Sequence, residues 1–150
     1  MKFNKDTYTY MWPRDGALVS IALARANYGS LCESFFDFCS QIITDQGYVL
    51  HKFNPDTSLG SSWHPKYRNG KPQLPIQEDE SALILIALAE YTKHRGDIST
   101  AKRLYNDVVL KIGRWMVSYR DKKTGLPLPS YDLWEEQLGV FSYTCATVIR

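Results

Sequence analysis

Three acidic side chains flank a tryptophan in the segment "DLWEE", which spans residues 132–136. Carboxyl groups that crowd together repel one another when ionised, and this repulsion raises the pKa of at least one of them. A carboxyl group that keeps its proton near neutral pH can donate that proton to a leaving group, which is general acid catalysis. The segment is therefore a candidate catalytic motif.

A second motif, "YTYMWPRDG" at residues 8–16, places a cation beside an anion. Arg14 and Asp15 together offer N–H donors and carboxylate acceptors, which suit a ligand that carries many hydroxyl groups. Aromatic rings near both motifs could cover the C–H face of a sugar; they belong to Tyr8, Tyr10, Trp12 and Trp134. A place in the core or in a wall is the commoner fate of a single aromatic residue.

A third acidic motif, "PIQEDES" at residues 75–81, also precedes an apolar segment. Helix capping is the simpler explanation for Asp15, Asp79 and Glu80, because acids in a first turn complement the positive end of a helix. Capping needs only one short acceptor at each helix, however, and "DLWEE" offers three carboxylates around one indole. Both explanations stay open at this point.

The elements that carry these motifs are predicted to be helices. Segments 17–28 and 81–95 are apolar on nearly every face, at least in the first turns, and such helices must be buried on all sides. Segments 31–43 and 98–119 carry their apolar residues on one side, which is typical of helices at the surface. Segment 138–149 is predicted to be a third buried helix. The order is therefore inner, outer, inner, outer, inner.

The connections between these helices alternate between short and long. Segments 44–80 and 120–137 are both longer than the about 12–15 residues that a structureless loop usually has, unless the loop is functional. Both are expected to lie on one face, above the starts of the inner helices, and that face is where we expect the site. Within the first loop, residues 47–55 are predicted to pair as a short strand. A barrel of alternating inner and outer helices is the preferred architecture, and a solenoid of helix pairs is the alternative.

Composition narrows the class of protein. With 150 residues, 44% hydrophobic and 23% charged, the chain has the size and composition of one globular domain. No apolar run is long enough to span a bilayer, and a formal charge of +2 gives no broad basic field, so we expect neither membrane nor nucleic-acid partners. A basic cluster at residues 64–71 is the one candidate patch, and a solvated loop explains it about as well. His64 in this cluster is either a sugar contact or, more commonly, a loop histidine. The cysteines do not form a disulfide pattern and indicate a reducing, cytoplasmic location.

The three motifs resemble the glucoamylase-type inverting glycoside hydrolases, a family that includes glucoamylases, glucodextranases and some microbial trehalases. The resemblance lies in "YTYMWPRDG", "PIQEDESALILIAL" and "SYDLWEEQLGVFSYTCATVI" and runs from Tyr8 to the last residue. It implies an all-α fold that is part of an (α/α)6 barrel, with the active site on the long-loop face. It also implies release of glucose from the non-reducing ends of α-glucans.

The resemblance assigns roles to particular residues. Glu135 is implied to be the general acid, and Arg14 and Asp15 are implied to hold the hydroxyl groups of the terminal glucose. The other expected substrate-binding residues are Tyr10 and Trp12 in the pocket wall, Asp132 and Trp134 beside the acid, and Glu136 toward the next sugar. No metal-ligand spacing appears, so we expect neither a metal nor another cofactor.

The family takes its general base from a glutamate much farther along the chain, and no segment here matches that motif. An inverting hydrolase needs this second carboxylate about 6.5–9.5 Å from the first. We therefore expect residues 1–150 to be the N-terminal portion of a catalytic domain, inactive when isolated and prone to self-association. The sequence leaves the linkage open between α-1,4, α-1,6 and α,α-1,1. The alternative from another class is a non-catalytic carbohydrate-binding or regulatory module, similar to the regulatory subunits of phosphorylase kinase.

Overall fold

A computed structural model describes residues 9–61 and 67–149, so Tyr8 and His64 lie outside the described residues. The described part of the chain is mostly helical, which confirms the all-α class. The helices are α1 (Pro13–Arg25), α2 (Gly29–Ile42), α3 (Glu78–Arg95), α4 (Ser99–Arg103), the π-helix η1 (Tyr105–Leu110), α5 (Lys111–Ser118) and α6 (Ser142–Ile149). Two short antiparallel hairpins pair β1 (Tyr67–Arg68) with β2 (Lys71–Pro72) and β3 (Ser130–Tyr131) with β4 (Leu138–Gly139).

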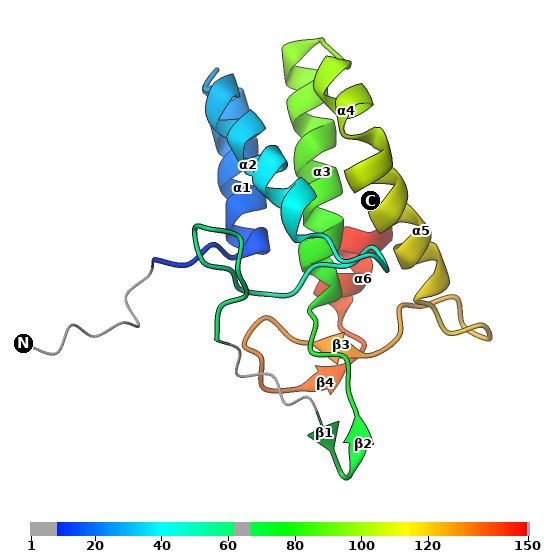
Figure 1. Cartoon of the computed structure of the whole chain (residues 1–150). Helices are drawn as coiled ribbons and strands as arrows, with labels where there is room; N and C mark the ends of the chain where they lie inside the picture. Colours follow the sequence, from blue (N-terminus) through cyan, green and yellow to red (C-terminus); the bar gives the residue numbers. More distant parts are fainter. Residues whose placement is uncertain (1–8, 62–66, 150) are drawn as a thin grey trace, which may run out of the picture.

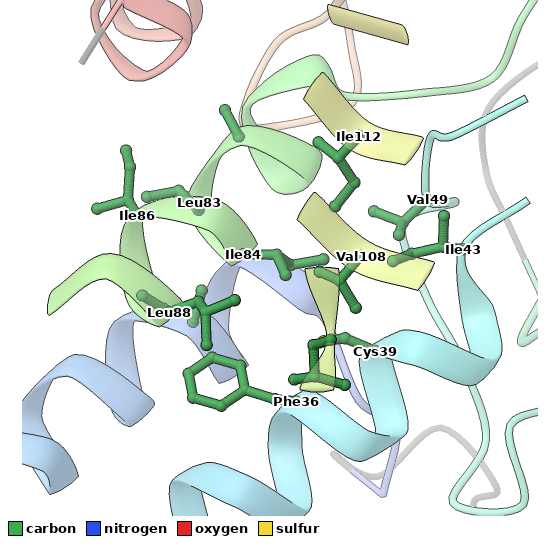
Figure 2. Close-up of a cluster of buried hydrophobic side chains, with 14 of the residues drawn as sticks. Phe36, Cys39, Ile43, Val49, Leu83, Ile84, Ile86, Leu88, Val108 and Ile112 are labelled. Carbon is green, nitrogen blue, oxygen red and sulfur yellow. The ribbon is translucent and has the colours of Figure 1, made fainter. Parts of the chain in front are cut away.

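Helix α3 lies at the centre of the core. It packs against α1 and α6 and also contacts α2, α4 and α5. Between Glu78 and Leu88 every one of its side chains except Leu85 is buried, as its all-round apolar sequence predicts. Figure 2 shows Phe36 and Cys39 of α2 and Val108 of η1 converging on α3 from other parts of the chain.

Helix α1 departs from the prediction that it is buried on all sides. Leu18 and Val19 are 48% and 56% exposed. Helix α1 packs against α2 and α3, and this leaves one apolar face of the helix open. Helix α6 also leaves apolar side chains exposed, Tyr143 and Ile149 among them. The arrangement shown here is therefore a set of packed inner and outer helices rather than a closed ring.

We expect the isolated chain to self-associate, because an exposed apolar face drives assembly. Light scattering of the purified chain should show species larger than a monomer at micromolar concentration. Replacement of both Leu18 and Val19 by lysine should reduce this association, since it places charge on the open face of α1. A monodisperse monomer of the unmodified chain, with a cooperative thermal transition, would contradict the prediction.

Two further predictions differ from the structure: the helix expected to begin at residue 138 begins later, and the strand expected at residues 47–55 is absent from the described residues. Helix α6 begins at Ser142 rather than at residue 138, because Leu138 and Gly139 pair with β3 instead. Residues 47–55 do not form a strand; Phe53 makes only isolated bridges, to Met11 and to Leu59. A short hairpin in the first case, and isolated bridges in the second, replace the element that the local pattern predicts.

The fourth predicted helix, residues 98–119, is present but interrupted. Its backbone turns out of α-helical register at Leu104, whose carbonyl oxygen accepts hydrogen bonds from the N–H groups of both Val108 (2.9 Å) and Val109 (3.3 Å). The second of these is the wider bond of a π-helical turn. The apolar stripe nevertheless stays on one side, with Leu104, Val108 and Ile112 all buried.

The two long loops gather on one face, as predicted. Figure 1 shows the loop after α2 and both hairpins at the end of the molecule where α1, α3 and α6 begin. The loops are joined there, since the N–H of Tyr131 donates to the carbonyl oxygen of Ile76 at 2.9 Å. Among the described residues, no helix is long and apolar enough to cross a membrane.

Candidate active site

Arg14 fixes the first turn of α1 against the first turn of α3. Pro13 opens the helix at a position where its missing N–H costs nothing. The Arg14 Nε then donates to Oδ2 of Asp79 at 2.8 Å, and Nη2 donates to Oε1 of Gln77. Nη2 also lies 3.7 Å from Oε1 of Glu80. Three side chains of one segment therefore hold a single guanidinium group.

The acids of α3 do not cap the helix with hydrogen bonds. Neither α1 nor α3 has a side-chain hydrogen bond at its N-cap, and the N-cap residues are Trp12 and Gln77. Glu78, Asp79 and Glu80 are all almost completely buried. The acids of the first turn of α3 therefore interact with groups of the site, in addition to the helix dipole.

Glu80 lies in the middle of this charged group. Burial raises its pKa well above the ordinary value of a glutamate, and Arg14 opposes this shift. The charges of Asp79, Glu135 and Asp15 add to the increase in pKa. Glu80 thus lies in the first turn of α3, 3.7 Å from the guanidinium group of Arg14, which lines the cleft described below.

Glu78 is the most isolated of the three acids. Neither of its carboxyl oxygens has a hydrogen-bond partner within the described part of the chain. Burial raises the pKa of Glu78 to about 8, against the opposing charge of Arg120. This carboxyl group is therefore protonated in the folded protein at neutral pH.

The protonation of Glu78 predicts a pH dependence of stability. In the unfolded chain Glu78 loses its proton near pH 4.5, whereas in the folded chain it keeps the proton to about pH 8. The folded state binds more protons between these values, so its contribution to stability is largest below pH 4.5 and declines up to about pH 8. Glu78→Gln should reduce this decline by at most about 1.4 kcal/mol per pH unit, the limit for one proton. Urea unfolding of both proteins from pH 5 to pH 8 measures the difference, and equal slopes would contradict it.

The "DLWEE" segment forms the loop between β3 and β4. The Asp132 Oδ1 accepts hydrogen bonds from the N–H groups of Glu136 (2.8 Å) and Gln137 (3.1 Å). The carbonyl oxygen of Asp132 accepts the N–H of Glu135 at 3.0 Å. Glu135 itself has a φ of 63°, a left-handed conformation that is uncommon outside glycine. Asp132 thus acts as the organiser of the turn that presents Glu135.

The carboxyl group of Glu135 faces residues of the first long loop. Its Oε2 lies 3.3 Å from Nε2 of the buried His51. Burial is the main cause that raises the pKa of Glu135, while the charges of Lys52 and Arg14 lower it. Asp132 contributes the smallest increase. The sequence-based explanation by crowded carboxylates is therefore a minor part of the shift, and removal from water is the major part.

A cleft of about 520 Å³ opens beside Glu135. This is within the range of small-molecule sites, about 300–1,000 Å³. Its lining contains most of the residues that the sequence predicts for the site: Trp12, Arg14, Asp15, Trp134, Glu135 and Glu136, together with Leu133. The indole of Trp134 is 81% exposed at this cleft. An exposed aromatic ring in the wall of a cleft can contact the apolar face of a ligand.

Two predicted residues do not line the cleft. Tyr10 packs edge-on against Trp12 with 5.9 Å between ring centroids, and Nζ of Lys52 lies 4.5 Å from the centre of the Tyr10 ring. Tyr10 therefore supports Trp12 from outside the cleft. Asp132 accepts the hydrogen bonds that shape the β3–β4 turn, so it affects the cleft only through the positions of Glu135 and Glu136.

Sequence reasoning missed several residues that the fold brings to the site. His51 and Lys52 were assigned only to a short strand, yet both side chains are 2% exposed and lie near Glu135. The motif "PIQEDES" contains Gln77 but indicates no role for it. The side chain of Gln77 is fully buried against Arg14. The adjacent His51-Lys52 pair, which stands between the apolar Leu50 and Phe53, was the only pattern in the sequence that could have indicated buried polar side chains here. Within the described ranges, no cluster of three histidine, cysteine, aspartate or glutamate residues could hold a metal ion.

Two comparisons with known proteins found a match. The family described as glycosyl hydrolases family 15 matches residues 2–150. The chain belongs to this family. An uncharacterized glycosyl hydrolase of Methanocaldococcus jannaschii is 33% identical over 138 residues, which cover 91% of this chain and 20% of that protein. The chain therefore spans about a fifth of the length of this curated relative. No solved structure matches the chain.

Proposed function

We propose that this chain is the N-terminal portion of a glucoamylase-like catalytic domain. The domain releases glucose from the non-reducing ends of α-glucans with inversion at the anomeric carbon. Glu135 is the general acid, which protonates the glycosidic oxygen as the bond breaks. Arg14 and Asp15 bind the hydroxyl groups of the terminal sugar.

The observation that carries the proposal is the position of Glu135 at the cleft. Its carboxyl group lies in a partly buried setting that raises its pKa, and the same cleft is lined by Arg14 and Asp15. A neutral carboxyl group can donate a proton where an ionised one cannot. Trp12 and Trp134 add aromatic surface to the cleft, which suits the apolar faces of a sugar ring. An acid, hydroxyl-binding groups and aromatic rings are together the requirements of a glycosidase subsite.

The proposal includes a general base outside these 150 residues. Inversion requires a second carboxylate that activates water on the opposite face of the sugar, about 6.5–9.5 Å from the acid. The relative from Methanocaldococcus jannaschii is about five times as long as the aligned segment, which leaves ample chain for such a residue. Trehalase and glucodextranase activities are variants of the same proposal, because both would use the same acid and the same terminal glucose.

The test is hydrolysis by the complete polypeptide that carries this chain. It should be assayed on maltose, on dextran and on trehalose, and proton NMR should follow the anomer first released. Release of β-glucose from one of these substrates supports the proposal and identifies the linkage. The purified 150-residue chain should show no measurable turnover. Retention at the attacked carbon, seen as α-glucose from the non-reducing end of maltose or dextran or as α-glucose alone from trehalose, would contradict the proposed mechanism. So would turnover by the 150-residue chain that is abolished in Glu135→Gln.

A further inference from the structure

The side chain of Gln77 joins the two halves of the candidate site. Its Oε1 accepts a hydrogen bond from Nη2 of Arg14, on α1, and its Nε2 donates to the carbonyl oxygen of Asp132, in the β3–β4 loop. The residue is fully buried at the start of α3. One amide group therefore contacts two segments that are more than a hundred residues apart in the sequence.

The chemistry of the partners fixes the orientation of this amide. A guanidinium group has only donors, so it must face the amide oxygen. A backbone carbonyl has only acceptor capacity, so it must face the amide nitrogen. Glutamine satisfies both partners at once, and an ionised glutamate of the same shape would satisfy only Arg14.

The carbonyl oxygen of Asp132 is also the acceptor for the N–H of Glu135, at 3.0 Å. Gln77 thus contacts the same oxygen atom that closes the turn at Glu135. That turn holds Glu135 at a φ of 63°, a conformation that needs support from its surroundings. A buried donor on this carbonyl limits the movement of the turn relative to α3.

We infer that Gln77 is a positioning residue, which sets the candidate acid Glu135 relative to the hydroxyl-binding Arg14 through its two hydrogen bonds. This inference rests on the proposed function for its effect on catalysis. The geometric part is independent of that function, since it concerns only the mobility of residues 132–137. The two parts can therefore fail separately.

The first measurement is amide hydrogen exchange in the complete polypeptide that carries this chain. Gln77→Glu should speed exchange of the 132–137 amides at least about tenfold, the factor expected for the loss of one buried hydrogen bond. The matched control is Gln73→Glu in the same loop. The Oε1 of Gln73 accepts a hydrogen bond from the Tyr131 hydroxyl at 3.0 Å, and a carboxylate can accept it equally well. If the amides of residues 132–137 exchange at the wild-type rate in Gln77→Glu, the inference is overturned.

A second variant separates the two hydrogen bonds. Gln77→Met has a similar length but no donor and only a weakly accepting sulfur, so it should free both Arg14 and the turn. On the substrate that the wild type hydrolyses, Gln77→Glu should lower kcat about tenfold with little change in KM, and Gln77→Met should also raise KM. A fall in kcat without faster exchange would overturn the positioning role of Gln77, and faster exchange without any fall in kcat would overturn its effect on catalysis.

The unmodified protein provides a test that does not depend on a variant folding. The side-chain amide protons of Gln77 should exchange with solvent at least tenfold more slowly than those of an exposed glutamine, because both are enclosed and one is donated. NMR of the complete polypeptide measures this directly. Exchange at the rate of an exposed glutamine would overturn the inference. Absence of glycosidase activity in the wild type would remove the proposed function and leave this result unaffected.

Discussion

Glu135→Gln in the complete polypeptide is expected to slow hydrolysis of natural glucosides by about 10²–10⁴-fold, the range typical of general acid catalysis. A glutamine cannot protonate the sugar alkoxide that leaves. It keeps the size of the side chain and the left-handed backbone at this position, so the loop should keep its shape. The rate on α-glucosyl fluoride should fall far less, because fluoride departs without protonation. Steady-state kinetics on both substrates measure the difference.

Glu136→Gln is the matched control for this experiment. Glu136 lies in the same loop and lines the same cleft. We expect its replacement to weaken binding of the second sugar, seen as a higher KM for maltose, and to leave the fluoride reaction nearly intact. Equal slowing of both substrates by Glu135→Gln would show that the acid has been misassigned. So would a larger selective loss in Glu136→Gln.

Arg14→Met is expected to lower the free energy of unfolding by about 3–5 kcal/mol, the usual result when one partner of a buried ion pair is removed. Asp79, which is 1% exposed, would lose its partner at 2.8 Å. The loss should be smaller at acidic pH, because a protonated Asp79 no longer carries an unpaired charge. Urea unfolding at pH 5 and at pH 8 measures both effects.

The matched control for Arg14→Met lies in the last turn of the same helix. Arg25 forms an ion pair with Glu90 at 3.6 Å, but its side chain is 66% exposed. Arg25→Met should therefore change the free energy of unfolding by less than about 1 kcal/mol. Similar losses in the two variants would show that burial does not distinguish the pairs. In that case the role of Arg14 as the anchor of α1 would have to be abandoned.

The sequence predicted the features that depend on local pattern. The apolar periodicity predicted the order of the helices, and the loop lengths predicted the face on which Arg14 and Glu135 meet. Both are consequences of the need to bury apolar side chains, which repeats along the chain and is visible in it. The (α/α)6 barrel stays a prediction, since the described helices do not close a ring.

The features that the sequence did not reveal depend on distant contacts. Lysine is rarely buried, so the position of Lys52 inside the protein near Glu135 was not expected, even though the residue stands in an apolar segment. The pKa of Glu135 was predicted to rise through crowded carboxylates, but burial is the larger cause. Burial depends on which segments cover a residue, and the local sequence does not specify them. The start of α6 at Ser142 was missed for a different reason, because Leu138 and Gly139 pair with β3 in a local hairpin that the apolar pattern does not reveal.

The separation of Arg14, Gln77 and Glu135 along the chain has a consequence for the order of folding. Contacts between α1 and α2 close only a short loop, whereas the Arg14–Asp79 pair joins residues 65 positions apart and the Gln77–Asp132 contact joins residues 55 apart. The entropy lost on closing a loop increases with its length, so non-local pairs form slowly. We therefore expect the α1–α2 pair to form before the contacts of the candidate site, whereas the α1–α3 pair joins segments as far apart in the sequence as Arg14 and Asp79. During translation, a nascent chain that has emerged only as far as α2 would expose Arg14 before Asp79, its acidic partner, has emerged.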